Sequence, residues 1–179
     1  AVAIAQWAHE ALTLVEDLLV VSGLTDGTLV LDRESIELGG LVDEVLDRSG
    51  EEARPTLEFD PTVGCVLADR VRLTQAINCL VDNALARASS PDAIHVSIYG
   101  IGGDAIIDVA DDGEAISAAE KERLFERFHS PDGDGPSGSV LGVGLYLARH
   151  VAEAHGGCLL VSSPRSGGSL FSMILPLAE

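Results

Sequence analysis

Three widely separated parts of the chain carry groups that suit a phosphate-bearing ligand. Gly142 and Gly144 open a segment of helical composition, and glycines at a helix start let the backbone approach a ligand where exposed amides favour phosphate. Asn83 lies among apolar neighbours in another helical segment, and its side-chain oxygen suits Mg²⁺, which prefers oxygen ligands and phosphate. Asp111 ends a strand-like run, where its carboxylate can accept a hydrogen bond from the exocyclic amine of a base. Each signal is weak alone, so the elements that position these groups matter.

Strand-like and helical segments alternate from residue 28 onward. Strand composition occurs at residues 28–32, 56–60, 65–68, 94–100, 104–110, 158–163 and 169–175. Helical patterns lie at residues 36–50, 69–88, 117–128 and 141–155. The stretch IYGIGGDAII predicts two strands joined by a glycine-rich hairpin turn, and Ser117 three residues before Glu120 predicts a helix start. Residues 130–139 have the composition of a mobile loop, suited to a lid over a ligand.

The first 22 residues predict one helix that packs against a partner helix. They contain neither Gly nor Pro, and apolar residues recur at heptad spacing before Gly23, namely Ile4, Trp7, Ala11, Leu14, Leu18 and Val21. Such a stripe is typical of a helix bundle, formed with another segment or with another subunit.

Composition and charge exclude several classes of partner. The 179 residues are 46% hydrophobic and 22% charged, which is typical of a globular domain. The net charge of -18 argues against nucleic acid or an anionic membrane surface as the main partner. The three cysteines have no metal-binding spacing, so we expect reduced, intracellular thiols. No apolar run reaches the length of a membrane span.

Four motifs follow one another in order: QAINCLVDNA (75–84), DDGEAI (111–116), LFERF (124–128) and GVGL (142–145). In this order and spacing they resemble the N box, first glycine box, F box and second glycine box of sensor histidine kinases, within the gyrase, Hsp90, histidine kinase and MutL ATP-binding superfamily. GGSLFSMILP (167–176) is similar to the closing strand of that domain. The resemblance runs from about Leu18 to Pro176.

The resemblance implies the architecture and the domain organisation. The fold would be an α/β two-layer sandwich, the Bergerat ATP-binding fold, with a mixed sheet covered by helices on one face and preceded by an N-terminal bundle helix. Residues 1–27 would be the second helix of a dimerisation and phosphoacceptor hairpin with its junction. Residues 28–179 would be the ATP-binding catalytic domain.

The same resemblance implies the ligands and partners. The cofactors would be ATP and Mg²⁺, with Asn83 at the metal position and Asp111 at the adenine position. The implied nucleotide-binding residues are Asn83, Arg87, Asp111, Gly113, Ala115, Gly142, Val143, Gly144 and Leu145. The γ-phosphoryl group would pass to a histidine helix upstream in the same protein or in a partner subunit, and later to a response regulator. We also expect a homodimer formed through the N-terminal helix and a cytoplasmic location, whether or not the parent protein is anchored in a membrane.

Several positions depart from the pattern of the family. Cys79 stands where superfamily ATPases place a glutamate, so nothing there could activate a water for hydrolysis. Ala86 and Arg87 replace the lysine and aromatic residue that often follow the asparagine, and Arg87 could supply the missing positive charge. Ala115 and Val140 replace glycines of the two glycine boxes. These departures support an alternative: a degenerate module that keeps the fold for protein binding or phosphotransfer without binding ATP.

The histidines lead to two further expectations. His9, Glu10 and Thr13 match part of the H-E-x-x-T-P histidine box of the family. Only fourteen residues of helical character separate His9 from Leu24, a single helix of about 20 Å, which leaves no room for a hairpin. We therefore expect the phosphoacceptor outside this segment and His9 on the flank of the helical seam. His155 ends a helical segment, where a cation would suit the helix dipole.

Overall fold

The structure is a computed structural model that describes residues 15, 19, 20, 22, 23, 30–48, 54–126, 143–164 and 167–178. Three sequence predictions lie wholly or mainly outside these residues: the N-terminal heptad helix with His9, the loop at 130–139, and Gly142. The division of the chain at residue 27 also stays a prediction.

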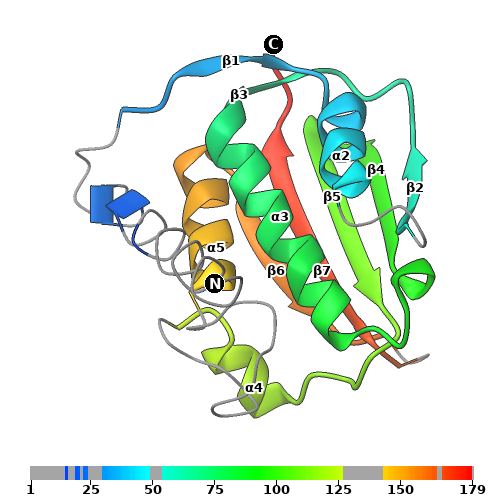
Figure 1. Ribbon diagram of the computed structural model, residues 1–179. Coiled ribbons are helices and arrows are strands. Elements are labelled where there is room, and N and C mark those ends of the chain that lie inside the picture. Colours follow the sequence, from blue (N-terminus) through cyan, green and yellow to red (C-terminus); the bar gives the residue numbers. More distant parts are fainter. Residues whose placement is uncertain are drawn as a thin grey trace, which may run out of the picture.

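A five-stranded mixed sheet forms one layer of the molecule (Figure 1). In spatial order its strands are β2 (Thr56–Phe59), β4 (His95–Ile101), β5 (Asp104–Asp111), β7 (Ser169–Pro176) and β6 (Cys158–Ser162). β2 and β4 run parallel, and the other neighbours are antiparallel. The turn between β4 and β5 contains Gly102 and Gly103 with φ of 63° and 99°, which confirms the predicted hairpin.

Helices cover one face of this sheet (Figure 1). They are α2 (Leu38–Asp47), α3 (Arg70–Arg87) and α5 (Gly144–Ala154), while the short α4 (Ala118–Arg123) lies at one end. The apolar residues of α3 recur at helical spacing and are buried: Leu73, Ala76, Ile77, Leu80, Val81 and Ala84. The expected two-layer α/β architecture is therefore confirmed. Among the described residues, no helix has the length and apolar content needed to cross a bilayer.

The first predicted strand is wrong in position. Residues 30–32 lie outside any strand, and Val30 is 90% exposed. β1 instead spans Arg33–Ile36 and pairs antiparallel with β3 (Val66–Asp69) in a separate two-stranded sheet. The reason lies in tertiary packing. Ile36 pairs with Val66 and is buried in the core, whereas Val30, in the apolar run at 28–32, is exposed and does not pack against the core.

His155 joins the end of α5 to the start of α3. Its Nε2 accepts a hydrogen bond from the Asp69 amide at 2.9 Å, and its Nδ1 lies 2.7 Å from the carbonyl of Val151. Asp69 in turn caps α3 by accepting from the Arg72 amide at 3.1 Å. Because α3 and α5 pack side by side and the cap that ends α5 meets the cap that starts α3, the two helices run antiparallel (Figure 1).

The expected helix-end cation at His155 is wrong. Burial lowers the pKa of this imidazole below its ordinary value of 6.5, and the charge of Arg33 lowers it further, against the opposing effects of the Val151 carbonyl and Asp69. The neutral ring is also what the contact requires, since Nε2 must stay unprotonated to accept from the Asp69 amide.

This contact makes stability depend on pH. The unfolded chain binds a proton at His155 near pH 6.5, whereas the folded chain binds it only at lower pH. The stabilisation is therefore complete above pH 6.5 and is lost as the pH falls through the folded-state pKa. Urea unfolding between pH 5.5 and 7.5 should show a smaller loss of stability on acidification for His155→Gln than for the wild type. His95→Gln, at an exposed position of β4, is the control, and parallel curves for all three proteins would contradict the assignment.

Candidate functional site

Two polar residues interrupt the apolar face of the sheet at one end. Residues of β5 alternate between half-buried and buried, and the buried row is Ala105, Ile107, Val109 and Asp111. Ser169 begins the corresponding buried row of β7 and lies opposite Asp111 in the strand register. A carboxylate and a hydroxyl therefore lie side by side beneath the helices, where the rest of both rows is apolar.

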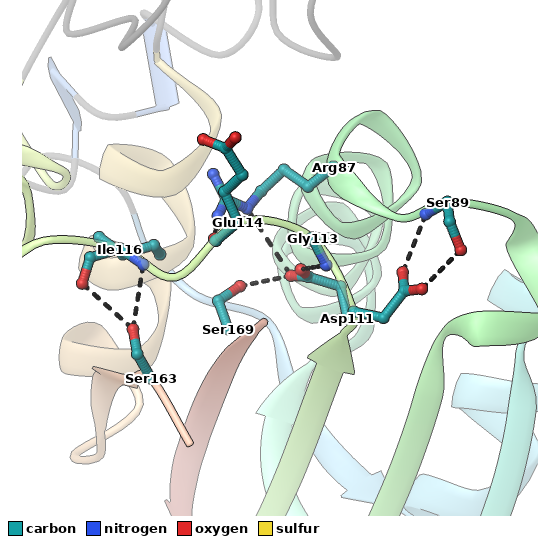
Figure 2. A network of polar contacts seen from close by, with 9 residues as sticks. Arg87, Ser89, Asp111, Gly113, Glu114, Ile116, Ser163 and Ser169 are labelled. Atoms are coloured by element: carbon teal, nitrogen blue, oxygen red, sulfur yellow. Dashed lines mark hydrogen bonds and ion pairs between the residues drawn. The ribbon is translucent and has the colours of Figure 1, made fainter. Parts of the chain in front are cut away.

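The carboxylate of Asp111 is held from two sides (Figure 2). Its Oδ1 accepts a hydrogen bond from the Gly113 amide at 2.9 Å, and its Oδ2 accepts one from the Ser169 hydroxyl. Position 113 requires glycine, because a Cβ there would lie 2.6 Å from the carbonyl oxygen of Arg87. The side chain of Asp111 is 0% exposed, so its orientation is set by these contacts and not by water.

Arg87 reaches across this carboxylate from the last turn of α3 (Figure 2). Its Nε lies 3.7 Å from Oδ2 of Asp111, and its Nη2 donates a hydrogen bond to the carbonyl of Glu114. The Nε is buried and makes no hydrogen bond within the described structure. The Arg87 guanidinium therefore links the end of α3 to the turn formed by residues 111–115. Ala115, in this turn, is exposed.

Asn83 lies one turn before Arg87 on α3. The residue is half-buried, and its Nδ2 is buried without a hydrogen-bond partner among the described residues. A buried amide that lacks a protein partner is costly, and a ligand would satisfy it. The nitrogen and oxygen of such an amide exchange places by a half-turn of the side chain, so either atom can face a ligand.

The start of α5 is directed toward the half of α3 that carries Asn83 and Arg87. α5 runs antiparallel to α3 but is shorter, with 11 residues against 18, so it begins beside the middle of α3 and not beside its last turn (Figure 1). Val143 and Gly144 are buried here, and Leu145 is half-buried. Val143 occupies the cap position and makes no side-chain capping bond. Of the predicted residues, Arg87, Asp111 and Gly113 are in direct contact, while Asn83 lies one turn before Arg87 and residues 143–145 lie at the start of α5.

A hollow elsewhere does not contain the predicted site. It has a volume of about 590 Å³ and is lined by Leu19, Val20, Val71, Arg72, Thr74, Gln75 and Asn78. None of the predicted nucleotide-binding residues lines this hollow.

Comparison with known proteins identifies the domain. Residues 68–179 match the family of histidine kinase-, DNA gyrase B-, and HSP90-like ATPases, which is more than half of the chain. The chain belongs to this family. Within it, the chain carries the catalytic ATP-binding domain of a two-component sensor histidine kinase.

The relatives agree with this assignment. The sensor protein SphS of Synechococcus elongatus is 34% identical over 176 residues, which cover 91% of this chain and 43% of SphS. The sensor-like histidine kinase SenX3 of Mycolicibacterium smegmatis is 29% identical over 174 residues, covering 94% of this chain and 45% of SenX3. The chain thus spans less than half of these relatives.

A solved structure shares the fold. Full-length ShkA in complex with AMPPNP superposes with a TM-score of 0.82 at 23% identity, covering 99% of this chain and 38% of ShkA.

Sequence reasoning did not select Ser169 as a site residue. It lies in GGSLFSMILP, where serine, phenylalanine, methionine and leucine alternate at positions 169, 171, 173 and 175. All four are buried, so a serine in an otherwise apolar row was the available signal. Asp112, next to Asp111, was also passed over. It accepts from the amide and hydroxyl of Ser89, and these bonds lower the pKa of its carboxyl, the hydroxyl more than the amide.

Gly168 brings the start of β7 against the end of β5 in this ATP-binding domain. A Cβ at Gly168 would lie 1.9 Å from the backbone oxygen of Asp111, and its φ is +78°. Gly167 also has a positive φ, of +100°, but a Cβ there would meet nothing within 4 Å. A side chain at either glycine would therefore be strained by the positive φ, but only a side chain at Gly168 would also clash with the backbone of Asp111.

Alanine substitutions at these neighbours should have unequal effects. Gly167→Ala should cost about 1 kcal/mol of unfolding free energy, the usual cost of a side chain at positive φ. Gly168→Ala should cost on the order of 3 kcal/mol or more, because the clash adds to the strain. Chemical unfolding followed by circular dichroism measures both, and equal losses would show that β7 does not depend on this close approach.

Proposed function

We propose that the domain binds ATP with Mg²⁺ and transfers the γ-phosphoryl group to a histidine outside residues 1–179. The observation that carries this proposal is the buried carboxylate of Asp111, held by Gly113 and Ser169 at the end of two apolar rows. In the proposed complex, Asp111 and Gly113 recognise adenine, and Arg87 and Ala115 border the base. Asn83 holds the metal, and residues 142–145 contact the phosphates.

The chemistry of Asp111 supports adenine as the base. A carboxylate without water must find N–H or O–H donors in the protein or in a ligand. Each of its oxygens can accept more than one hydrogen bond, so the contacts with Gly113 and Ser169 leave capacity for the exocyclic amine of adenine. Guanine presents a carbonyl oxygen at the equivalent place, which a carboxylate would repel.

The side chain of Asn83 supports a metal-bound triphosphate. Its Nδ2 is buried and has no hydrogen-bond partner among the described residues, and Asn83 lies one turn from Arg87, near the base end of the proposed site. An amide oxygen is a suitable ligand for Mg²⁺, which keeps several waters and binds phosphate oxygens. When bound, the metal would neutralise charge that develops on the phosphates.

Transfer to a protein acceptor is better supported than hydrolysis. Cys79, one turn before Asn83, is half-buried and packs against the apolar core, so this position offers no carboxylate base for water. In the transfer, an imidazole nitrogen forms a bond to the γ-phosphorus, the bond to the bridging oxygen breaks, and ADP leaves. The imidazole loses its proton to the glutamate that follows the histidine in the H-E-x-x-T-P sequence, or to water. The domain's own residues position and bind the nucleotide.

The wider setting belongs to the same proposal. The acceptor histidine lies on a hairpin helix upstream or in a partner subunit, and a response regulator then receives the phosphoryl group. The N-terminal helix forms the homodimer, and the domain lies in the cytoplasm. A degenerate domain that does not bind ATP is the second candidate, favoured by the complete burial of the Asp111 side chain beneath Arg87.

Nucleotide titration separates the two candidates. Titration of the chain with a fluorescent ATP analogue, with and without Mg²⁺, should show saturable binding that the metal strengthens. Asp111→Asn should weaken it roughly tenfold to a hundredfold, because a charged hydrogen-bond acceptor is lost. Asp112→Asn is the matched control, since Asp112 is exposed and bonds only to Ser89 in the described contacts. A flat titration of the folded wild type would support the degenerate domain.

Phosphotransfer tests the acceptor. A hairpin bearing the H-E-x-x-T-P sequence, supplied in trans with γ-labelled ATP and Mg²⁺, should acquire label that is lost in acid and retained in alkali. Asp111→Asn should reduce the rate in proportion to the lost affinity at low ATP. Acid-stable label would instead indicate transfer to a hydroxyl, and label on the chain itself would return His9 as a candidate acceptor.

A further inference from the structure

We propose that Arg87 is a latch over the base-recognising carboxylate, so that adenine reaches Asp111 only after the guanidinium moves away. The latch would set the affinity of the site, and the inference rests on the proposed function. Asp111 is the residue best suited to recognise a base, yet its side chain is 0% exposed.

In the described part of the structure, three groups contact the carboxylate of Asp111, and they differ in kind. The Gly113 amide belongs to the same turn, and the Ser169 hydroxyl belongs to the neighbouring strand. Both orient the carboxylate without using all of its acceptor capacity. Arg87 comes from a different layer, the end of α3, and lies against Oδ2 with its own side chain 20% exposed. Of the three groups, the guanidinium is therefore the one that a base can displace.

The closed position of Arg87 is held incompletely. Its Nε forms an ion pair with Oδ2 of Asp111 at 3.7 Å, which is beyond hydrogen-bond distance, and this buried Nε makes no hydrogen bond to the described residues. One bond, from Nη2 to the Glu114 carbonyl, fixes the head of the side chain. An unpaired buried donor is unfavourable, whereas in water the same group would be solvated. Opening breaks the hydrogen bond to Glu114 and the long ion pair with Asp111, and solvation of the freed guanidinium offsets part of the cost.

Opening has a simple effect on binding. When only a fraction of the molecules is open, the apparent dissociation constant equals the intrinsic constant divided by that fraction. The exocyclic amine of adenine then replaces the guanidinium as a donor to Asp111. Removal of the guanidinium should therefore tighten binding of the base, which is the reverse of what a residue that contacts the ligand favourably would show.

Adenosine is the probe that isolates this step, because it has the base but no phosphate that could interact with the charge of Arg87. Calorimetric titration of the 179-residue chain should show that Arg87→Ala binds adenosine about threefold to tenfold more tightly than the wild type. Arg87→Lys, which keeps the charge but lacks the fork that reaches Glu114, should lie between them. Arg70→Ala, an exposed arginine of the same helix that pairs with Glu44, should bind as the wild type does.

Equal or weaker adenosine binding by Arg87→Ala would overturn the latch. Adding Asp111→Asn to Arg87→Ala should remove the gain, and a gain that persists would also overturn it. A second measurement needs no variant: in ¹⁵N-arginine-labelled wild type, saturation with adenosine should speed exchange of the Arg87 Nε proton with water, and unchanged exchange contradicts the proposal.

The failure of the latch can be told apart from the failure of the proposed function. If ATP binding depends on Asp111 but Arg87→Ala brings no gain, the latch alone fails. If neither ATP nor adenosine binds the folded wild type or Arg87→Ala, the proposed function fails and the latch falls with it.

Discussion

The hydrogen bond between Ser169 and Asp111 is the interaction on which the arrangement of the site depends. It places a polar pair where the core-facing rows of β5 and β7 would otherwise continue as apolar side chains. A carboxylate buried at that depth is tolerated because Gly113 and Ser169 supply donors, and Arg87 offsets its charge at a longer distance. The close approach of Gly168 to the Asp111 backbone serves the same end, since it brings the two strand ends together.

A second polar contact, at the other end of the helices, sets the direction of α5. The imidazole of His155 accepts from the amide of Asp69, and Asp69 also caps α3. The antiparallel pairing that results directs the start of α5 toward the half of α3 that carries Asn83 and Arg87. Thus these two polar contacts lie at opposite ends of α3, with an apolar stripe of this helix between them.

Much of the fold could be predicted from the sequence because the signals are local. The alternation in β4 and β5, the paired glycines of their turn and the helical spacing of α3 each reflect a period of the backbone. The position of β1 could not be predicted, because the apolar run at 28–32 carries no mark of what it would pack against. At the site, the motifs located Asn83, Asp111 and Gly113, but the contact between Arg87 and Asp111 joins residues 24 positions apart and has no local signature. The neutral state of His155 likewise depends on burial that arises only in the folded chain.

The attachment of β1 has a mechanical consequence. The Asp32 amide donates to the Asp69 carboxylate at 3.1 Å, and Arg33 donates to the carbonyl of Ala154 at 2.7 Å. Both anchors lie where α3 begins and α5 finishes, far along the helix axes from Asp111. A pull or twist exerted through the preceding residues would therefore act along the axes of these two helices and would displace them as whole units relative to Asp111.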